Sequence, residues 1–245
     1  MFKRALDISL ALIGLIVFFP LLVIVVFLVW VQDYHSPFYI PPRVGKNNTI
    51  FYMVKLRSMV MNADKSGVDS TSSNDQRITG VGRFIRKCKL DEITQLWNVL
   101  LGDMSLVGPR PNIKRETDLY TSVEQKLLTV KPGITDFSSI VFSDEGEILK
   151  DHPDPDIGYN QLIRPWKSAL GIFYIEHQNF ILDAQLIYLT VITIFSRRKA
   201  LLGLSRLLQL YKAPKELIEV SCRQHPLAPC PPPGSGEIFT RRVGC

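Results

Sequence analysis

The feature that most constrains this 245-residue chain is a long uncharged segment close to its N-terminus. From Ile8 to Val31 no side chain carries a charge. A helix over that run would be about 36 Å long at about 1.5 Å per residue, enough to cross a hydrocarbon core of about 30 Å. We therefore expect the chain to associate with membrane lipid.

Two features of this segment argue against a simple crossing. Pro20 lies in the middle of the run, where it removes a backbone hydrogen bond and kinks or breaks a helix. Positive residues, which mark the cytoplasmic side of a membrane, flank the run at both ends. They are Lys3 and Arg4 before it, and Arg43, Lys46, Lys55 and Arg57 after it. The sequence therefore predicts a re-entrant helix–break–helix hairpin over residues 1–35 whose two ends share one face.

A spanning helix and a cleaved signal peptide are the alternatives for the same segment. The apolar part of a signal peptide has about 7–15 residues and ends at small side chains. The run from Ile8 to Val31 is longer and ends in bulky residues. The hairpin is therefore the favoured interpretation.

The charge after the apolar segment changes sign along the chain. Residues 77–115 contain eight Lys or Arg and three acidic side chains, whereas residues 116–158 contain three Lys and ten acidic side chains. A nucleic-acid-binding chain is expected to carry one continuous basic surface, so we expect no nucleic acid partner. The basic block instead indicates a local phosphate site or a surface that faces anionic lipid.

The remaining pattern predicts an α+β, mostly helical fold in which interfacial amphipathic helices surround a small folded domain. A strand is predicted over residues 50–56, and a helix with Asp91 as N-cap runs from Glu92 until Gly102 stops it. The basic, Leu-rich stretch up to Lys212 predicts a helix lying on the membrane surface, with a core-packing helix as an equal alternative. Residues from Pro214 onward are expected to form a flexible tail.

We accordingly expect three parts along the chain. Residues 1–35 form the membrane hairpin, and residues 36–200 form the catalytic domain with its interfacial helices. Residues 201–245 form an amphipathic helix and a flexible C-terminal tail.

The best candidate for chemistry is the pair Asp91–Glu92 at the start of a predicted helix. A helix N-terminus exposes unpaired N–H groups and the positive end of the helix dipole, which favour an ionised carboxylate and attract phosphate. Asp91 would then suit attack on phosphorus, and Glu92 would move a proton or help hold a divalent cation. Basic residues precede the pair at Arg83, Arg86, Lys87 and Lys89. Acidic pairs also open many helices without a catalytic role, and the pattern alone favours that explanation.

Arg110 is a second candidate because Pro109 and Pro111 restrict the backbone on both sides of it. Its guanidinium is thereby presented for bidentate phosphate binding or, equally, for a structural ion pair. Asp154 and Asp156 are weaker candidates for a metal bound to a nucleotide sugar, since their proline-rich setting suits a solvated loop. The chain has no P-loop, dinucleotide-binding or zinc-protease motif.

In its central block the chain resembles the bacterial sugar transferases, which are monotopic phosphoglycosyl transferases. The matching residues are Leu90-Asp91-Glu92, Gln95-Leu96-Trp97-Asn98-Val99-Leu100 and Gly102-Asp103-Met104-Ser105-Leu106-Val107-Gly108-Pro109-Arg110-Pro111. Further matches are Lys3-Arg4, Asp7, Pro20, Lys55, Arg57-Ser58-Met59, Arg77-Ile78-Thr79, Gly82-Arg83, Lys131-Pro132-Gly133-Ile134-Thr135, Asp183 and Thr190. The similarity covers about residues 2–195, and it outweighs the structural explanation of Asp91 and Glu92.

The resemblance implies an enzyme that transfers a sugar 1-phosphate from a UDP-sugar to polyprenyl (undecaprenyl) phosphate and releases UMP. This is the first membrane step of surface polysaccharide synthesis, on the cytoplasmic face of the inner membrane. By resemblance, Asp91 attacks the phosphate next to the sugar and carries a phosphosugar intermediate, Glu92 assists, and Mg²⁺ is held near Asp91. The substrate phosphates would be bound by Arg110, Lys55, Arg57 and Arg83. Pro20 would mark the break in the membrane hairpin, and a homodimer is an alternative to a monomer.

The chain departs from many relatives directly after Thr135. They continue with Gly and an aromatic residue leading to Gln, whereas this chain has Asp136-Phe137-Ser138-Ser139. The resemblance therefore does not predict which sugar is transferred. Two other functions stay open: a non-catalytic membrane scaffold or lipid-phosphate-binding protein, and a direct glycosyl transferase that uses Asp154 and Asp156 and releases UDP. A phosphosugar trapped on Asp91, and the identity of the released nucleotide, would distinguish them.

Overall fold

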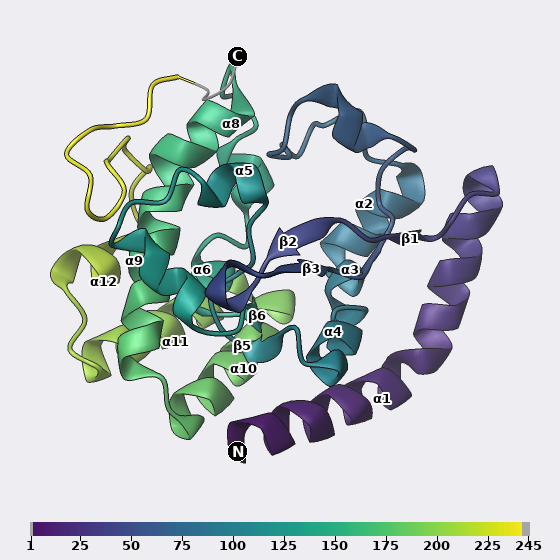
Figure 1. Ribbon diagram of the computed structural model, residues 1–245, viewed down its shortest axis with the longest axis horizontal. Helices are drawn as coiled ribbons and strands as arrows, with labels where there is room; N and C mark the ends of the chain where they lie inside the picture. Colours follow the sequence, from purple (N-terminus) through teal and green to yellow (C-terminus); the bar gives the residue numbers. More distant parts are fainter. Residues whose placement is uncertain (1, 242–245) are drawn as a thin grey trace.

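Helices make up most of the computed structural model, which describes residues 2–241 (Figure 1). They are α1 (Phe2–Asp33), α2 (Gly80–Lys87), α3 (Leu90–Ile93), α4 (Leu96–Leu101), α5 (Lys114–Thr117), α6 (Phe137–Val141), α7 (Glu145–Ile148), α8 (Pro155–Gly158), α9 (Arg164–His177), α10 (Phe180–Phe195), α11 (Arg197–Leu210) and α12 (Lys215–Cys222). Short 3-10 segments cover Lys46–Asn48, Ala63–Ser66 and Glu124–Thr129, and a π-helical segment covers Tyr159–Ile163. The predicted mostly helical α+β class is confirmed.

The strands are short and form three separate pairs in the described residues. They are β1 (Phe38–Tyr39), β2 (Pro42–Val44), β3 (Ile50–Tyr52), β4 (Lys55–Leu56), β5 (Ser105–Val107) and β6 (Gly133–Thr135). The β1–β4 and β2–β3 pairs are antiparallel, whereas β5–β6 is parallel. The predicted strand over residues 50–56 is therefore two short strands that face different partners.

The main hydrophobic core lies between α6, α9, α10 and α11. Phe137 and Leu170 are fully buried there, as are Leu186 and Leu204. The inner face of α11 packs into this core, as the core-packing alternative predicted, while Leu202 and Leu210 on its other face are exposed. Figure 1 shows these helices on the opposite side of the molecule from the second half of α1.

The apolar segment near the N-terminus forms one helix, α1, which includes Pro20. The expected break into two helices is absent: Figure 1 shows a single helix that bends about half-way and then follows the edge of the molecule. A proline inside a helix removes one backbone hydrogen bond and causes a kink, while the bonds on either side keep the helix continuous. By length and composition α1 could cross a membrane, and only 11% of its most apolar 18-residue window is buried.

The first turns of α1 are attached to the rest of the protein by polar side chains. Lys3 forms an ion pair with Asp183, whose other oxygen accepts a hydrogen bond from the Tyr174 hydroxyl at 2.6 Å. Asp7 accepts hydrogen bonds from the Ser105 hydroxyl at 2.8 Å and from the Leu106 N–H at 3.0 Å. These contacts fix the start of α1 against α10 and β5.

The last turn of α1 is attached through a second set of charges. The Arg57 guanidinium donates to both carboxylate oxygens of Asp33, at 2.5 and 2.6 Å, and to the Ser36 carbonyl at 2.7 Å. The hydrogen bonds from Arg57 lower the pKa of Asp33 to about 2. Both polar ends of this apolar helix are therefore bound to the same folded body.

In the described residues, the stretch after Pro214 begins with α12 and continues from residue 223 to residue 241 without regular structure, mostly exposed but held by a few hydrogen bonds. Gln161 on the π-helical segment accepts from the Cys230 N–H at 3.2 Å and donates to the Phe239 carbonyl at 2.7 Å. Thr121 donates to the Pro233 carbonyl at 2.5 Å. Composition predicted a loose tail because Pro-rich sequences lack regular structure, yet such a segment still packs when its backbone finds partners.

We expect the buried ion pair between Arg164 and Glu124 to be needed for stability. Their side chains are 3% and 0% exposed, and two hydrogen bonds of 3.0 and 2.7 Å join them. Arg164→Met would leave a buried carboxylate without its partner and lower the free energy of unfolding by about 3–5 kcal/mol. Denaturant titration of the purified protein, followed by tryptophan fluorescence, measures this change.

The matched control is Lys126→Met, because Lys126 pairs with Glu176 at 3.7 Å on the surface. Exposed pairs contribute about 0–1 kcal/mol, so this variant should unfold almost like the unaltered protein. Equal stability of the two variants would contradict a structural role for the buried pair.

Candidate active site

A cleft of about 970 Å³ collects the residues that the sequence singled out. Its walls come from β4, α2, α3, the loop after β5, and the segment from α6 to α7. Six of the predicted site residues line it: Lys55, Arg57, Arg83, Asp91, Glu92 and Arg110. Pro20 lies apart from them inside α1.

The helix that carries Asp91 and Glu92 differs from the prediction. Two short helices, α3 and α4, replace one, and the N-cap position belongs to Lys89, which has a left-handed backbone with φ of 52°. Asp91 therefore lies in the first turn of α3 and is not the N-cap. Since α3 has only four residues, the charge around the carboxylates comes from side chains and not from a helix dipole. Gly102 does end α4 as predicted, with φ of 96°.

Two polar side chains hold the segment that contains Asp91 against the strand that carries Lys55. The Thr94 hydroxyl lies 3.0 Å from the Val54 carbonyl and 3.1 Å from the Asp91 carbonyl. Asn98 accepts from the Val54 N–H at 2.8 Å and donates to the Tyr52 carbonyl at 2.7 Å. Because Lys55 follows Val54 directly, these bonds fix its position relative to Asp91. The sequence motif contains Asn98 but not Thr94, and it does not show what Asn98 contacts.

Arg110 is positioned by the parallel pair β5–β6. A Cβ on Gly108 would lie 2.6 Å from the Lys131 carbonyl, and one on Gly133 would lie 2.1 Å from the Gly108 nitrogen. Only glycine allows this close approach of the two backbones. The Arg110 guanidinium then donates to the Ile134 carbonyl at 3.0 Å and to Glu92 Oε1 at 2.9 Å. Its position beside the carboxylates agrees with both roles that the sequence left open.

The pKa values of the two carboxylates of the site are shifted in opposite directions. Burial raises the pKa of the Asp91 carboxyl, and the charge of Glu92 adds to the rise, although Lys55 and Arg110 oppose it. Burial also disfavours the ionised form of Glu92, but the attraction of Arg110, Lys89 and Lys55 outweighs it and lowers the pKa of that carboxyl. The Asp91 carboxylate accepts no hydrogen bond from the described residues, so its two side-chain oxygens are available for a ligand or for attack.

Lys55 carries the cation that interacts most strongly with Asp91. Burial lowers the pKa of its ammonium group to about 8, with a smaller opposing effect from Asp91. Nearby Arg110 and Arg43 add to the decrease. Lys55 is therefore a cation that loses its charge not far above neutral pH.

The two other predicted phosphate ligands behave differently from each other. The Arg57 side chain is only 5% exposed and is committed to Asp33 and Ser36 at the end of α1. Arg57 thus fixes the end of α1, and its contact with a substrate phosphate stays a prediction. Arg83 lies on α2 with an exposed side chain that forms no ion pair with any described residue, so it can reach a ligand in the cleft.

The opposite wall of the cleft contains an ion pair that sequence reasoning missed. Lys167 on α9 contacts Glu145 on α7 at 3.1 Å and lies 5.1 Å from the centre of the Tyr159 ring. The negative charge of Glu145 also helps to raise the pKa of Arg110, although Glu92 has the larger effect. No local pattern predicts this group, because its members lie far apart in the sequence.

The segment that departs from the relatives also borders the cleft. Asp136 caps α6 by accepting from the Ser139 N–H at 2.7 Å, and it accepts from the Ser138 hydroxyl as well. Ser138 and Ser139 both line the cleft. The departure therefore alters a wall of the site without removing its local order.

Asp154 and Asp156 do not join this cleft in the described residues. Asp154 caps α8 by accepting from the Asp156 N–H at 3.0 Å. Asp156 accepts from the Ser70 N–H at 2.7 Å and so holds the loop before α2. These structural tasks give no support to the predicted nucleotide-sugar metal site.

The described residues contain no group of three or more His, Cys, Asp or Glu side chains arranged to hold a metal. Mg²⁺, however, is usually bound by one or two carboxylates, with substrate phosphates and water completing the shell. Asp91 and Glu92 provide adjacent hard oxygen donors, one of them without a hydrogen-bond partner among the described residues. The donor set fits a magnesium site that is completed by substrate.

Comparison with known proteins matches the chain to the bacterial sugar transferase family over residues 1–197. It is 30% identical over 204 residues to the exopolysaccharide production protein ExoY of Sinorhizobium fredii, covering 77% of this chain and 83% of that protein. A Bacillus subtilis protein, provisionally named an undecaprenyl-phosphate N-acetylgalactosaminyl 1-phosphate transferase, is 41% identical over 133 residues. That match covers 54% of this chain and 70% of the relative.

A longer relative is the undecaprenyl-phosphate galactose phosphotransferase of Salmonella typhimurium, which is 40% identical over 148 residues. The match covers 54% of this chain but only 31% of that protein. Together with the fold, these similarities identify a transferase enzyme associated with a membrane helix. The chain belongs to the bacterial sugar transferase family, as its central block indicated.

Lys55 leads to a prediction about pH. If its ammonium group binds donor phosphate, the KM for the donor should rise as pH increases through about 8, because the charge is lost there. Lys55→Arg should remove this dependence, since arginine keeps its charge to above about pH 12. Steady-state kinetics between about pH 7 and about pH 9 measures the effect.

The control for that measurement is Lys114→Arg, because Lys114 pairs with Asp118 on the surface and does not line the cleft. It should keep the pH dependence of the unaltered protein. A donor KM that stays constant over this pH range before any substitution would refute the role of Lys55.

Proposed function

We propose that this enzyme transfers a sugar 1-phosphate from a UDP-sugar to polyprenyl phosphate, with release of UMP. The names of two relatives refer to undecaprenyl phosphate together with galactose or N-acetylgalactosamine transfer. The name of a third refers to exopolysaccharide production. The reaction would accordingly begin the synthesis of a surface polysaccharide. We leave the sugar unspecified because the relatives differ and Ser138 and Ser139 alter the cleft.

The reaction takes place in two displacements at one phosphorus atom. An Asp91 oxygen attacks the phosphate next to the sugar, and the bond between that phosphorus and the bridging oxygen breaks, so that UMP leaves with the oxygen. The phosphosugar is then held on Asp91 as an acyl phosphate. An oxygen of polyprenyl phosphate attacks the same phosphorus, which breaks the bond to Asp91 and restores the carboxylate.

The observation that carries the proposal is the setting of the Asp91 carboxylate. It lies in the cleft without a hydrogen-bond donor among the described residues, and the positive charges of Lys55 and Arg110 act on it. A buried anion that must approach a diphosphate needs such cations to offset the repulsion. Glu92 holds Arg110 in place and is itself kept ionised. Arg83 supplies a further cation to the donor phosphates.

We further propose that Asp91 and Glu92 hold Mg²⁺ together with the phosphates of the donor. The bound ion would neutralise charge on the diphosphate and stabilise the leaving UMP. The protein residues provide two carboxylate oxygens, and Arg110 keeps Glu92 oriented for that task. Removal of divalent cations should therefore stop nucleotide release.

The bent helix α1 supports the proposed re-entrant placement in the cytoplasmic face of the inner membrane. Lys3 and Asp33, close to its two ends, are both paired with residues of the same folded body. Between them, Ile16, Phe19 and Ile24 expose more than half of their side chains. Such apolar exposure is favourable in lipid and unfavourable in water. The ends would then lie on one face while the middle dips into the bilayer.

Nucleotide release from a purified sample tests the reaction. With Mg²⁺, undecaprenyl phosphate and a panel of UDP-sugars, the enzyme should release UMP, and Asp91→Asn should lower the rate at least about 10³-fold because the nucleophile is lost. Without acceptor, a burst of UMP and a phosphosugar on Asp91 should be found by mass spectrometry. A chelator should abolish both.

The matched control is Asp154→Asn, since asparagine caps a helix as well as aspartate does. This variant should keep the UMP activity. Release of UDP that depends on Asp154 would instead establish direct glycosyl transfer. Absence of nucleotide from any donor, with polyprenyl phosphate still bound, would favour the scaffold.

The membrane placement makes a separate prediction. Single cysteines at positions 2 and 74, in place of Phe2 and Asn74 and in a background without native cysteines, should react with an impermeant maleimide from the same side. Inverted and right-side-out membrane vesicles distinguish the two faces. Labelling from opposite sides would mean that α1 spans the bilayer.

A further inference from the structure

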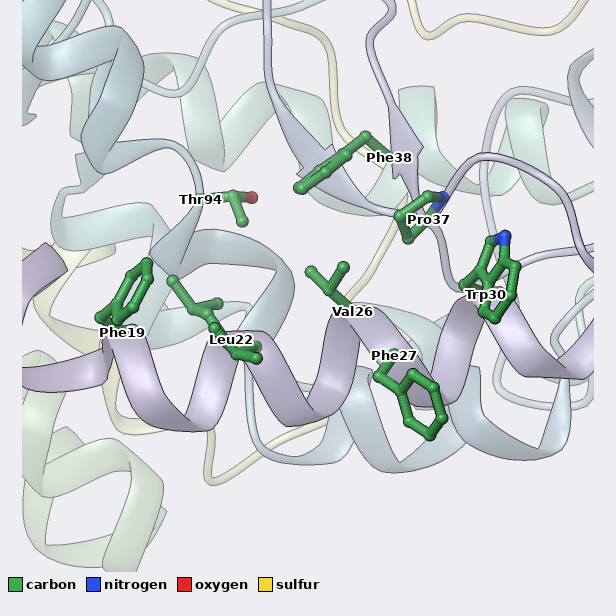
Figure 2. A pocket seen from close by; sticks show the side chains of 9 residues that line it. Phe19, Leu22, Val26, Phe27, Trp30, Pro37, Phe38 and Thr94 are labelled. Carbon is green, nitrogen blue, oxygen red and sulfur yellow. The ribbon is translucent and has the colours of Figure 1, made fainter.

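Two cavities among the described residues have opposite chemistry. The cavity beside the second half of α1, of about 600 Å³, is lined by apolar side chains such as Leu22 and Val26 and by no charged group (Figure 2). The catalytic cleft, of about 970 Å³, carries charged side chains on both of its walls. Of the two, the cleft is the one that offers hydrogen-bonding partners to a ligand rich in hydroxyl groups.

Only one wall of the cleft has a task in the proposed reaction. That wall carries Lys55, Arg83 and Arg110, which act on the donor phosphates. The opposite wall carries Glu145 on α7 and Lys167 on α9, whose charged atoms lie 3.1 Å apart. Because the charges of this pair cancel, it attracts a diphosphate far less than the first wall does. It suits a neutral ligand that both donates and accepts hydrogen bonds.

Both members of the pair keep hydrogen-bonding capacity for such a ligand. Glu145 uses Oε2 for Lys167, and its Oε1 accepts no hydrogen bond from the described residues. The Lys167 ammonium has three N–H donors, of which one bonds to Glu145 and a second is directed to the Tyr159 hydroxyl at 3.5 Å. The two side chains are 34% and 16% exposed, so a ligand in the cleft can contact them.

The Lys167 ammonium group stays charged in this setting. Burial disfavours its charged form, but the negative charge of Glu145 outweighs the burial and raises the pKa of Lys167 above its ordinary value. At neutral pH the pair therefore presents a carboxylate oxygen that accepts and, beside it, an N–H that donates. Two hydroxyl groups on neighbouring carbons of a sugar match this arrangement, because each hydroxyl can serve as donor or acceptor.

The pair lies within electrostatic reach of the phosphate site. The charge of Glu145 helps to raise the pKa of Arg110, after the larger effect of Glu92, and Arg110 in turn opposes the charge of Lys167. In the proposed reaction the phosphate attacked by Asp91 carries the sugar directly, whereas the ribose follows only after a second phosphate. A wall next to the attacked phosphate is therefore better placed for the sugar than for the ribose.

We propose that Glu145 and Lys167 bind hydroxyl groups of the transferred sugar and thereby help to select the donor. Glu145 Oε1 accepts from one hydroxyl, and the Lys167 ammonium donates to its neighbour. This inference rests on the proposed function and assigns the sugar end of the donor to the wall that the displacement itself does not use. Helix α7 follows Asp136-Phe137-Ser138-Ser139, where the chain departs from many relatives, so these sugar contacts need not match theirs.

The test compares donors that differ by one hydroxyl group. UDP-glucose, UDP-galactose and their N-acetylhexosamine counterparts are ranked by the UMP burst, and monodeoxy analogues of the best donor are then measured. With the unaltered protein, we expect one analogue to lose about tenfold or more in kcat/KM, because it leaves a polar partner in the cleft unpaired. In Glu145→Ala or Lys167→Met the same deletion should lower kcat/KM less than about threefold, because the protein partner is already missing.

An exchanged pair separates sugar binding from a purely structural role. The double variant Glu145→Lys with Lys167→Glu keeps an ion pair between α7 and α9 but exchanges donor and acceptor. Its denaturant midpoint should match that of the unaltered protein, while its kcat/KM for the best donor should stay about tenfold or more lower. Recovery of both stability and activity would show that the pair is structural and overturn the proposal.

The matched control is Glu176→Gln. Glu176 is 53% exposed near the end of α9 and does not line the cleft, so this variant should keep the stability, the donor KM and the response to each deoxy analogue. A change in the response to the analogues as large as that in Lys167→Met would mean that any alteration of α9 disturbs the site, and it would also overturn the proposal.

Inhibition by UMP distinguishes the sugar from the ribose, because UMP contains only the ribose. In Glu145→Ala and Lys167→Met the donor KM should rise about tenfold or more, while the inhibition constant of UMP should change less than about threefold. An equal rise of both would place the nucleotide at this wall and overturn the sugar assignment. A normal UMP burst with the same response to deoxy analogues in the variants overturns the sugar site alone, whereas no burst from the unaltered protein overturns the proposed function.

Discussion

The structure depends on the way one apolar helix is fixed by charges at both of its ends. Two ion pairs attach α1 to the same body. One joins Lys3 to Asp183, and the other joins Arg57 to Asp33 through two hydrogen bonds. An apolar helix alone would move freely in lipid, since it gains nothing by contacting protein in place of acyl chains. The charged ends provide this missing attachment. They also fix where α1 lies relative to the body that carries the cleft.

The chemistry of the cleft follows from burial of opposite charges close together. Burial opposes ionisation of Asp91, Glu92 and Lys55 alike, yet the groups differ in how far their neighbours compensate. Glu92 is compensated by direct hydrogen bonding to Arg110, whereas Asp91 has only charges at a distance. The less satisfied carboxylate is therefore the one that a bound cation would stabilise most. This asymmetry places two adjacent acidic residues in different electrostatic environments.

Several elements could be predicted from local pattern, and others could not. Gly102 ends α4 because only a residue without Cβ adopts that backbone at low cost, and this rule holds in any context. The continuous helix through Pro20 was missed because the backbone hydrogen bonds on either side of a proline can keep a helix intact, and the position of Asp91 inside α3 was missed because Lys89 takes the N-cap position. The Pro-rich segment after residue 222 was expected to be loose, but Gln161 and Thr121 give it hydrogen-bond partners. The pair Lys167–Glu145 had no sequence signal at all.

By itself, the sequence determined the apolar helix, the helical α+β class, the family and the identity of the acidic pair, because composition and a contiguous motif carry that information. Only the tertiary structure decided which cations face the carboxylates. Lys55 on β4 and Arg110 in the loop after β5 both lie near Asp91 and Glu92. Arg57, two residues from Lys55, instead pairs with Asp33 at the end of α1. Alternation along a strand would place Lys55 and Arg57 on the same face. The strand β4 ends at Leu56, however, and the two side chains take different partners according to what packs beside them, which a linear pattern does not contain.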